Sequence, residues 1–234
     1  ILQNISHRAL QEYSAYTEGM LYVQNSSSMI PVLILNPQPQ ERILDLCAAP
    51  GSKTTQIASM TENRASIVAV EKIKPRFYRL RANVHLQGAT SVELILSDGS
   101  WIGRRYPATF DKVLVDAPCS AEGLFRAHDP RTFGYWSLRK IKEMQRKQKR
   151  LIASGWQALK PGGMLIYSTC TYAPEENEIV VQWLCDKYPQ ETELLSITLP
   201  FTNYCSGLTS YGEMPLRPEI ALTRHILPTD TMEG

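Results

Sequence analysis

Short apolar segments alternate with amphipathic segments along the chain after residue 40. The apolar segments are rich in β-branched residues and have the length of buried strands. They predict strands at Ile43–Cys47, Ser66–Glu71, Val92–Ser97, Lys112–Asp116 and Met164–Thr169. Helical periodicity lies between them, at Thr54–Met60, Pro75–Gln87, Leu138–Leu159 and Glu175–Tyr188. Repeated strand–helix units predict an α/β fold with a mostly parallel central sheet that helices cover on both faces.

The two ends of the chain show weaker patterns. Ile1 to Tyr16 predicts a helix of weak amphipathicity, and a loop with two prolines follows at 36–40. We therefore expect residues 1–39 to form a helical or extended segment that leads into the main α/β domain at 40–234. Near the other end, Ile220 to Pro228 predicts a strand and a turn. Pro174 and the acidic residues after it predict the start of a helix.

The first predicted strand is followed by a turn of small residues, Ala48 to Ser52. In open α/β sheets a ligand binds at this place, and Gly51 permits backbone angles that other residues avoid. The turn does not match a P-loop, because Lys53 follows Ser52 rather than a glycine. It has one glycine, so it does not match the dinucleotide fingerprint either. A cofactor with a nucleoside but no pyrophosphate fits better, and an ordinary βα turn is the alternative.

Acidic residues end three of the predicted strands. Glu71 lies twenty residues after Gly51, the spacing at which a carboxylate accepts hydrogen bonds from ribose hydroxyls. Asp98 is placed to recognise an adenine edge, although an Asp-Gly pair is also an ordinary turn. Asp116 faces the same predicted cleft. For Glu71 a solvated carboxylate is the alternative.

Two cysteines follow strand ends that we expect to be neighbours. Cys119 comes after the strand that ends at Asp116, and Cys170 comes after the strand that ends at Thr169. A buried cysteine usually serves only in packing. Two cysteines over one cleft, beside a carboxylate, instead favour a catalytic role.

Composition restricts the cellular compartment and the kinds of site that the chain can have. The chain has five cysteines and no Cys-x-x-Cys pair, which argues against a disulfide framework or a zinc site and for a reducing compartment. No apolar run reaches the roughly 18 residues of a membrane span, and no signal peptide is visible. We therefore expect a cytoplasmic protein without metal or membrane attachment. Because the chain begins at Ile1 rather than Met, we expect it to be part of a longer protein.

Basic and aromatic residues cluster after Cys119. Seven of the twelve residues in Arg139–Arg150 are basic and one is acidic, so this helix is either a solvated face or a stripe that contacts phosphates through Arg146, Lys147 and Lys149. The segment 125–136 mixes basic and aromatic residues, which suit unstacked bases or a packed loop. The net charge of +2 neither requires nor excludes nucleic acid.

Four blocks resemble the catalytic domain of the Fmu/Sun-type RNA cytosine-5 methyltransferases. They are Asp45–Thr54, Asp116–Ser120, Tyr167–Thr171 and Pro174–Glu178. The resemblance runs from about Gly19 to the end of the chain. It implies a Rossmann-like class I methyltransferase fold, S-adenosylmethionine as cofactor, and methyl transfer to carbon 5 of a cytosine in RNA. Ribosomal RNA is favoured over transfer RNA, and a monomer is expected.

The resemblance also implies roles for individual residues. The cofactor site would be lined by Cys47, Ala48, Ala49, Pro50, Gly51, Ser52, Lys53, Glu71, Asp98 and Asp116. Cys170 would be the nucleophile, assisted by Cys119, Asp116 and Lys53. The chain departs from the family pattern at Ala121 and Gln40, where glycine is usual. Family members commonly add RNA-binding segments at one or both ends.

Two other interpretations were weighed. A DNA cytosine-5 methyltransferase would use Pro118-Cys119, but then Thr169-Cys170 has no explanation. An RNA-binding or assembly module without catalysis conflicts with the intact turn, both cysteines and Asp116. Finally, Thr231 to Gly234 resembles the family's lead into an aromatic-rich final strand, so we expect the chain to stop before that strand.

Overall fold

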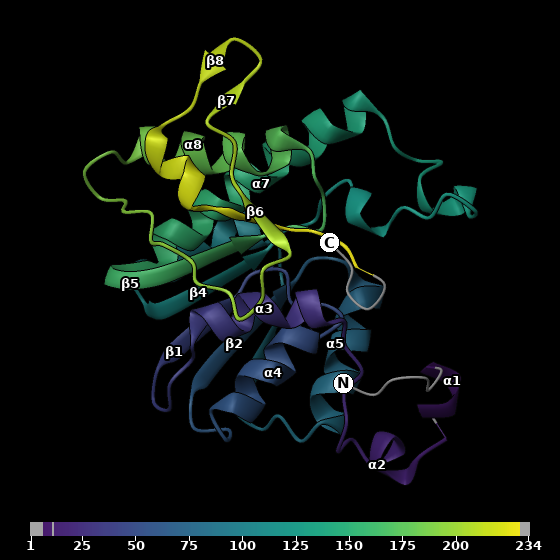
Figure 1. Cartoon of the computed structure of the whole chain (residues 1–234). Helices are drawn as coiled ribbons and strands as arrows, with labels where there is room; N and C mark the ends of the chain where they lie inside the picture. Colours follow the sequence, from purple (N-terminus) through teal and green to yellow (C-terminus); the bar gives the residue numbers. More distant parts are fainter. Residues whose placement is uncertain (1–6, 11, 230–234) are drawn as a thin grey trace.

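The computed structural model describes residues 7–10 and 12–229 and is built around a five-stranded parallel sheet (Figure 1). The strands are β1 (Arg42–Asp45), β2 (Ser66–Glu71), β3 (Val92–Leu96), β4 (Phe110–Asp116) and β5 (Leu159–Ser168). Their order is β3-β2-β1-β4-β5, and every neighbouring pair is parallel. The predicted α/β class and parallel sheet are confirmed.

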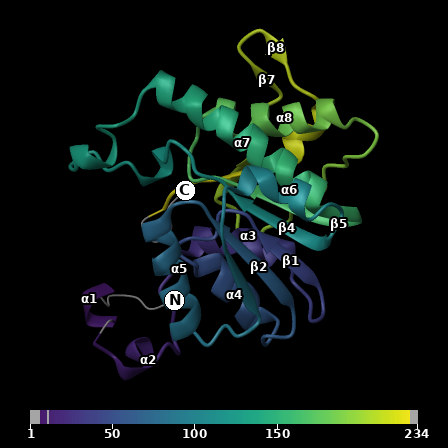
Figure 2. The same cartoon turned by 180° about the vertical axis from the view of Figure 1, so that it is seen from behind.

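Helices cover both faces of this sheet (Figure 2). They are α3 (Ser26–Leu35), α4 (Ser52–Met60), α5 (Lys74–Leu86), α6 (Ile102–Arg105), α7 (Leu138–Ala158) and α8 (Glu178–Lys187). Two further short helices, α1 (His7–Leu10) and α2 (Ser14–Thr17), lie to one side of the sheet (Figure 1). Alternate strand residues point to opposite faces. Ile43 accordingly packs in the cluster with α3, α4 and α5, whereas Leu44 packs in the cluster with α6 and α7. A third cluster joins α7 to α8.

The predicted helix over Ile1 to Tyr16 is wrong within the described residues. Glu12 and Tyr13 lie in a turn between α1 and α2, and each of these helices has four residues. The weak amphipathic pattern explains the difference, because α2 buries no side chain and so short a helix gains little from its own hydrogen bonds. Residues 1–6 and 11 lie outside the described residues.

The mixed segment before residue 40 contains α3, which sequence reasoning did not identify. Its side chains are apolar nearly all round and Pro31 lies inside it, so the helical period was hidden. The Asn25 side chain accepts a hydrogen bond from the Ser27 amide at 3.0 Å and caps the start of α3. Val32 and Leu35 are fully buried in the core of the sheet. The boundary between residues 39 and 40 stays a prediction, but α3 packs as part of the sheet domain.

The other predicted elements differ mainly at their ends. The predicted helix Glu175–Tyr188 is divided, because Asn177 adopts φ −114° and ψ −95° between the 3₁₀ turn η4 (Pro174–Glu176) and α8. The remaining 3₁₀ turns are η1 (Gly99–Trp101), η2 (Glu122–Leu124), η3 (Pro130–Thr132) and η5 (Pro218–Leu222). Among the described residues, no helix is long and apolar enough to cross a membrane.

The region after α8 forms two small antiparallel pairs rather than part of the central sheet. Strand β6 (Tyr204–Ser206) pairs with β9 (Arg224–Ile226), and β7 (Ser210–Tyr211) pairs with β8 (Met214–Pro215). The strand predicted from Ile220 is wrong at its start, because Pro218 opens η5 and Ile220 is buried within that turn. The predicted approach to a final strand, at Thr231 to Gly234, lies outside the described residues.

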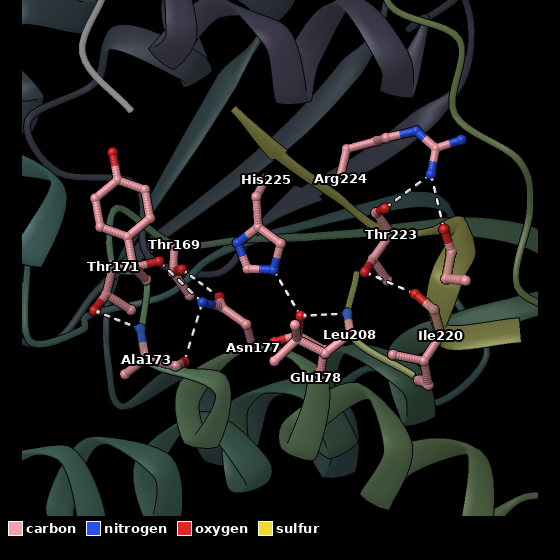
Figure 3. Close-up of polar contacts among 12 residues, drawn as sticks. Thr169, Thr171, Ala173, Asn177, Glu178, Leu208, Ile220, Thr223, Arg224 and His225 are labelled. Carbon is pink, nitrogen blue, oxygen red and sulfur yellow. Dashed lines mark hydrogen bonds and ion pairs between the residues drawn. The ribbon is translucent and has the colours of Figure 1, made fainter. Parts of the chain in front are cut away.

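A buried carboxylate ties this region to α8 (Figure 3). The Glu178 side chain is 0% exposed, and its Oε1 accepts from His225 Nε2 at 2.6 Å and from the Leu208 amide at 3.0 Å. Burial raises the pKa of Glu178, but these hydrogen bonds outweigh burial and lower the pKa below its ordinary value. The ionised carboxylate therefore holds β9 and the β6–β7 connection against α8.

Replacing His225 with Ala should destabilise the fold by about 1–3 kcal/mol at pH 7, because a buried carboxylate loses a partner. The pKa of Glu178 is lower in the folded state than in the unfolded state. The stabilisation by this carboxylate is therefore complete at pH values above the unfolded-state pKa, and it is lost as the pH falls through the folded-state pKa. The difference in unfolding free energy between the wild type and the variant should therefore shrink in acid. Urea unfolding at several pH values measures it, with the exposed His85→Ala on α5 as control. Equal losses in both variants at pH 7 would contradict this role.

Candidate active site

One cavity of about 1120 Å³ lies over the carboxyl ends of the strands. Its lining includes most of the residues that the sequence singled out: Cys47, Ala49, Pro50, Ser52, Lys53, Glu71, Asp98, Asp116, Cys119 and Cys170. Ala48 and Gly51 belong to the same turn but do not line this cavity, and both are buried. The fold thus gathers in one place residues from the ends of all five strands of the central sheet and from α4.

The turn after β1 is held by α5. Gly51 has φ +113°, a conformation that suits glycine, and a Cβ there would lie 3.1 Å from Leu80 Cδ1. Arg76 Nη2 donates to the Ala49 carbonyl at 2.6 Å, and Asn83 Nδ2 donates to the Pro50 carbonyl at 2.8 Å. These contacts fix the backbone that a ligand would approach.

Asp45 supports the turn from beneath, and sequence reasoning gave it no role of its own. Its carboxylate is 1% exposed and accepts from Thr54 Oγ1 at 2.7 Å. Burial raises the pKa of Asp45 to about 6, although the Thr54 bond acts in the opposite direction. The clue in the sequence was an acidic residue at the end of an otherwise apolar strand.

Glu71 and Asp98 stand at the ends of β2 and β3, as predicted. Glu71 is 5% exposed, and its Oε1 accepts from the Ile73 amide at 2.7 Å. Asp98 Oδ2 accepts from Lys72 Nζ at 2.6 Å, and its Oδ1 accepts from the Ser100 amide at 3.0 Å. Burial raises the pKa of Asp98, but hydrogen bonds from Lys72 and Ser100 outweigh it and lower the pKa to about 2. Asp98 is therefore an anionic acceptor at neutral pH.

The two cysteine sulfurs lie 3.3 Å apart. They come from the loops after β4 and β5, which are neighbouring strands as predicted. The hydrogen bond from Cys119 lowers the pKa of Cys170, and the positive charge of Lys53 acts in the same direction. The same bond and burial raise the pKa of Cys119. Cys170 is therefore the thiol that ionises first.

Lys53 and Asp116 form an ion pair beside the sulfurs. Lys53 Nζ lies 2.7 Å from Asp116 Oδ2 and also donates to Ser28 Oγ at 3.0 Å. Ser168 Oγ donates to Asp116 Oδ1 at 2.7 Å. The ammonium and the carboxylate are thus oriented by residues from α3 and β5.

The Cys119 loop is anchored by another buried carboxylate, that of Glu176. Its Oε2 accepts from the Ser120 amide at 3.0 Å and from Gln148 Nε2 at 2.7 Å. Gln148 Nε2 also donates to the Pro118 carbonyl at 2.9 Å. Sequence reasoning treated the acidic residues after Pro174 as a helix start. Glu176 and Glu178 instead turn inward to hold distant backbone, which no local pattern predicts.

Basic side chains of α7 divide between two faces. Lys140, Lys147 and Arg150 line the cavity. Lys149 does not, because its Nζ lies 5.8 Å from the centre of the Trp183 ring, and Arg146 is exposed away from the lining. Of the three residues expected to contact phosphate, the structure brings Lys147 to the cavity.

Exposed aromatic rings surround the Cys170 loop. Glu122 joins the Trp136 ring to the backbone of Tyr172, because its Oε1 accepts from Trp136 Nε1 at 2.7 Å and its Oε2 accepts from the Tyr172 amide at 3.1 Å. Trp136 and Tyr172 remain 40% and 36% exposed. Phe125 and Phe133 pack against each other with centroids 5.9 Å apart, so part of this segment is a packed loop. The described residues contain no group of three or more His, Cys, Asp or Glu that would hold a metal ion.

Known proteins share this architecture. The chain is 43% identical over 208 residues to ribosomal RNA small subunit methyltransferase F of Klebsiella pneumoniae, a match that covers 88% of this chain and 43% of that protein. A methyltransferase homologue from Pyrococcus horikoshii is 35% identical with a TM-score of 0.77, covering 91% of this chain and 65% of that one. NSun6 from Pyrococcus horikoshii, solved with SFG, is 31% identical with a TM-score of 0.73, covering 92% of this chain and 53% of that one.

The chain spans less than half the length of the curated relatives it matches. Residues 32–231 match the sequence model of the family described as 16S rRNA methyltransferase RsmB/F. That match covers most of the chain and all five strands of the central sheet. The chain therefore belongs to the RsmB/F family of 16S rRNA methyltransferases.

Proposed function

We propose that this chain transfers a methyl group from S-adenosylmethionine to carbon 5 of a cytosine in RNA through a covalent bond to Cys170. The observation that carries the proposal is the sulfur pair, with Cys170 and Cys119 3.3 Å apart beside the Lys53–Asp116 ion pair. Both sulfurs line the same cavity as the turn after β1. A base and a cofactor thus have room to meet there.

The lining of the cavity supports S-adenosylmethionine as cofactor. Glu71 presents a carboxylate at the position that suits ribose hydroxyls, and Asp98 is an anionic acceptor near the place of an adenine. NSun6, a relative, was solved with SFG, an analogue of this cofactor. When bound, the cofactor supplies an electrophilic methyl group. Glu71 and Asp98 would hold its nucleoside.

Cys170 performs the first chemical step of this proposal. Carbon 5 of cytosine is a poor nucleophile, and addition of a thiolate to carbon 6 makes it electron-rich. The sulfur–carbon bond forms as the double bond between carbons 5 and 6 shifts its electrons toward carbon 5. The lowered pKa of Cys170 supplies the thiolate. Asp116 accepts a hydrogen bond from the amino group, and from the ring nitrogen once that nitrogen is protonated in the adduct, while Lys53 orients its carboxylate.

The second step restores the aromatic base. Once carbon 5 carries the methyl group, its proton passes to solvent water. The electrons of that carbon–hydrogen bond re-form the double bond between carbons 5 and 6 as the bond from Cys170 to carbon 6 breaks, and its electron pair returns to the sulfur. Cys119, whose raised pKa keeps it protonated, lies within hydrogen-bond distance of the departing sulfur. We assign it to this resolution step.

RNA is the substrate class that the surroundings of the cavity favour. Lys140, Lys147 and Arg150 offer charges for phosphates, and exposed Trp136 and Tyr172 offer rings for unstacked bases. The relatives named ribosomal RNA small subunit methyltransferase F favour ribosomal over transfer RNA. Five free cysteines suit a cytoplasmic location, and we propose a monomer that needs no metal.

Glu71→Ala should weaken binding of S-adenosylmethionine by about 1–3 kcal/mol, because a ribose would lose a charged acceptor. Isothermal titration calorimetry measures this, and the exposed Glu93→Ala on the neighbouring strand β3 is the matched control. Binding of NAD or ATP by the wild type, with none of S-adenosylmethionine or its demethylated product, would contradict the proposed cofactor.

Replacing Lys147 and Arg150 together by Ala should weaken binding of a cytosine-containing single-stranded RNA. The slope of log affinity against log salt should fall by about 0.7 for each lost phosphate contact. Replacing Lys142 and Arg146, which carry the same charge on the same helix but do not line the cavity, should leave the slope nearly unchanged. Fluorescence anisotropy across a salt series measures both. Equal effects of the two pairs would indicate a face that is merely solvated.

The two cysteine variants should fail differently. Cys170→Ala should abolish methyl transfer and form no covalent adduct, because the attacking sulfur is gone. Cys119→Ala should still allow a slower attack and methyl transfer, and then accumulate a protein–RNA adduct because expulsion stalls. Methyl-transfer assays with cytosine-containing RNA and denaturing gels measure these outcomes.

Other results would favour a different mechanism or function. An adduct with Cys170→Ala and none with Cys119→Ala would exchange the roles and favour a DNA-type enzyme. Retained activity in both variants would exclude a covalent thiol. Cofactor binding without turnover in the wild type would favour an RNA-binding or assembly module.

A further inference from the structure

The side chain of Asn177 binds the chain on both sides of Cys170 (Figure 3). Its Oδ1 accepts from Thr169 Oγ1 at 2.6 Å. Its Nδ2 donates to the Thr171 carbonyl at 2.9 Å and to the Ala173 carbonyl at 3.1 Å. One amide therefore holds the residue directly before Cys170, the residue directly after it, and the turn that follows.

The same loop is joined to the loop of Cys119. Thr171 and Ser120 share a hydrogen bond between their hydroxyls at 2.8 Å, and the Gly123 amide donates to the Cys170 carbonyl at 3.0 Å. Thr171 is thus held by Asn177 on one side and by the Cys119 loop on the other. This connection joins the two segments that carry the sulfurs.

Asn177 is itself fixed by its neighbours in the chain. Glu176 anchors the Cys119 loop through the Ser120 amide at 3.0 Å, and Glu178 bonds to His225 at 2.6 Å. The unusual backbone of Asn177, with φ −114° and ψ −95°, lies between these two buried carboxylates. Three successive side chains therefore bind the Cys119 loop, the Cys170 loop and β9.

The contacts of Asn177 need both a donor and an acceptor. Two carbonyl oxygens require N–H donors, and the Thr169 hydroxyl requires an acceptor. An aspartate of nearly the same shape keeps the acceptor, but it places a carboxylate oxygen against two carbonyls. A half-buried acceptor facing acceptors loses its hydrogen bonds and is repelled, so the loop must move.

We propose that Asn177 is a positioning residue that fixes the backbone around Cys170 and so sets the distance of its sulfur from Cys119. This inference deepens the proposed function and rests on it for the identity of the nucleophile. In that reaction the loop must hold its sulfur at carbon 6 of the base while Cys119 stays in reach for the later step. A displacement of about 1 Å at such a position lowers turnover by roughly a hundredfold.

The test compares Asn177→Asp with the wild type by two measurements. The first is methyl transfer to a cytosine-containing RNA, in which kcat should fall by about tenfold to a hundredfold while the RNA KM and cofactor affinity stay unchanged. The second is the rate of Cys170 alkylation by iodoacetamide against pH, followed by peptide mass spectrometry. Its midpoint should move upward, because Cys170 loses its Cys119 contact. The groups that face this thiol are Cys119, Asp116, Lys53 and Tyr135.

Asn63→Asp is the matched control, because Asn63 also holds a loop through its amide, with Nδ2 donating to the Gly88 carbonyl at 3.0 Å. It should leave both measurements unchanged. Thr169→Val is the milder second variant, since it removes only the hydroxyl that bonds Asn177, and it should shift both measurements in the same direction by a smaller factor. If Asn177→Asp does not fold, Thr169→Val tests the positioning role of Asn177 in its place.

Wild-type kcat and an unshifted alkylation midpoint in Asn177→Asp would overturn the inference. So would a loss that appears equally in kcat, KM and thermal stability with no change in alkylation, because that pattern describes a merely structural contact. The alkylation measurement needs no RNA. If the wild type transfers no methyl group, the proposed function fails, but the alkylation shift still tests the positioning of Cys170 by Asn177.

Discussion

The parallel pairing of β4 with β5 is the constraint on which the site depends. Asp116 lies opposite Ser168 in this register, so the chain leaves both strands at the same level of the sheet. The two loops that follow carry Cys119 and Cys170, and the sulfurs meet at 3.3 Å. A shift of the register by one residue would also turn the buried side chains of β4 to the wrong face. The packing of the core and the geometry of the sulfurs are therefore coupled.

Buried polar groups convert this proximity into a defined arrangement. Asp45, Glu176 and Glu178 are almost fully buried. Asp45 accepts a hydrogen bond from Thr54 in the following helix, whereas Glu176 and Glu178 accept from residues distant in the sequence. A buried carboxylate without partners is costly, so each one strongly favours the conformation that satisfies it. Glu176 and Glu178 lie on either side of Asn177. The start of α8 thus serves as a common support for the two cysteine loops and for the C-terminal pair β6–β9.

The site also shows how electrostatics distinguishes two chemically identical groups. Cys119 and Cys170 are both half-buried thiols. The hydrogen bond between them lowers the pKa of one and raises that of the other, and Lys53 favours the anion on Cys170. The proposed roles of attacking thiolate and protonated assistant follow from this difference. They do not follow from the identity of the residues alone.

The strands of the central sheet could be predicted from the sequence, because buried parallel strands are continuous apolar runs and their pattern is local. The sequence also determined which residues end those strands, so Glu71, Asp98, Asp116, Cys119 and Cys170 could be predicted to share a cleft. It did not reveal α3, whose apolar residues have no clear helical face, or the antiparallel pairing of β9 with β6. The partners of Glu176, Asn177 and Glu178 were likewise decided only by the tertiary structure. Those contacts join residues that are distant in the chain or separated by an irregular turn, and no local pattern encodes which backbone group a buried side chain will meet.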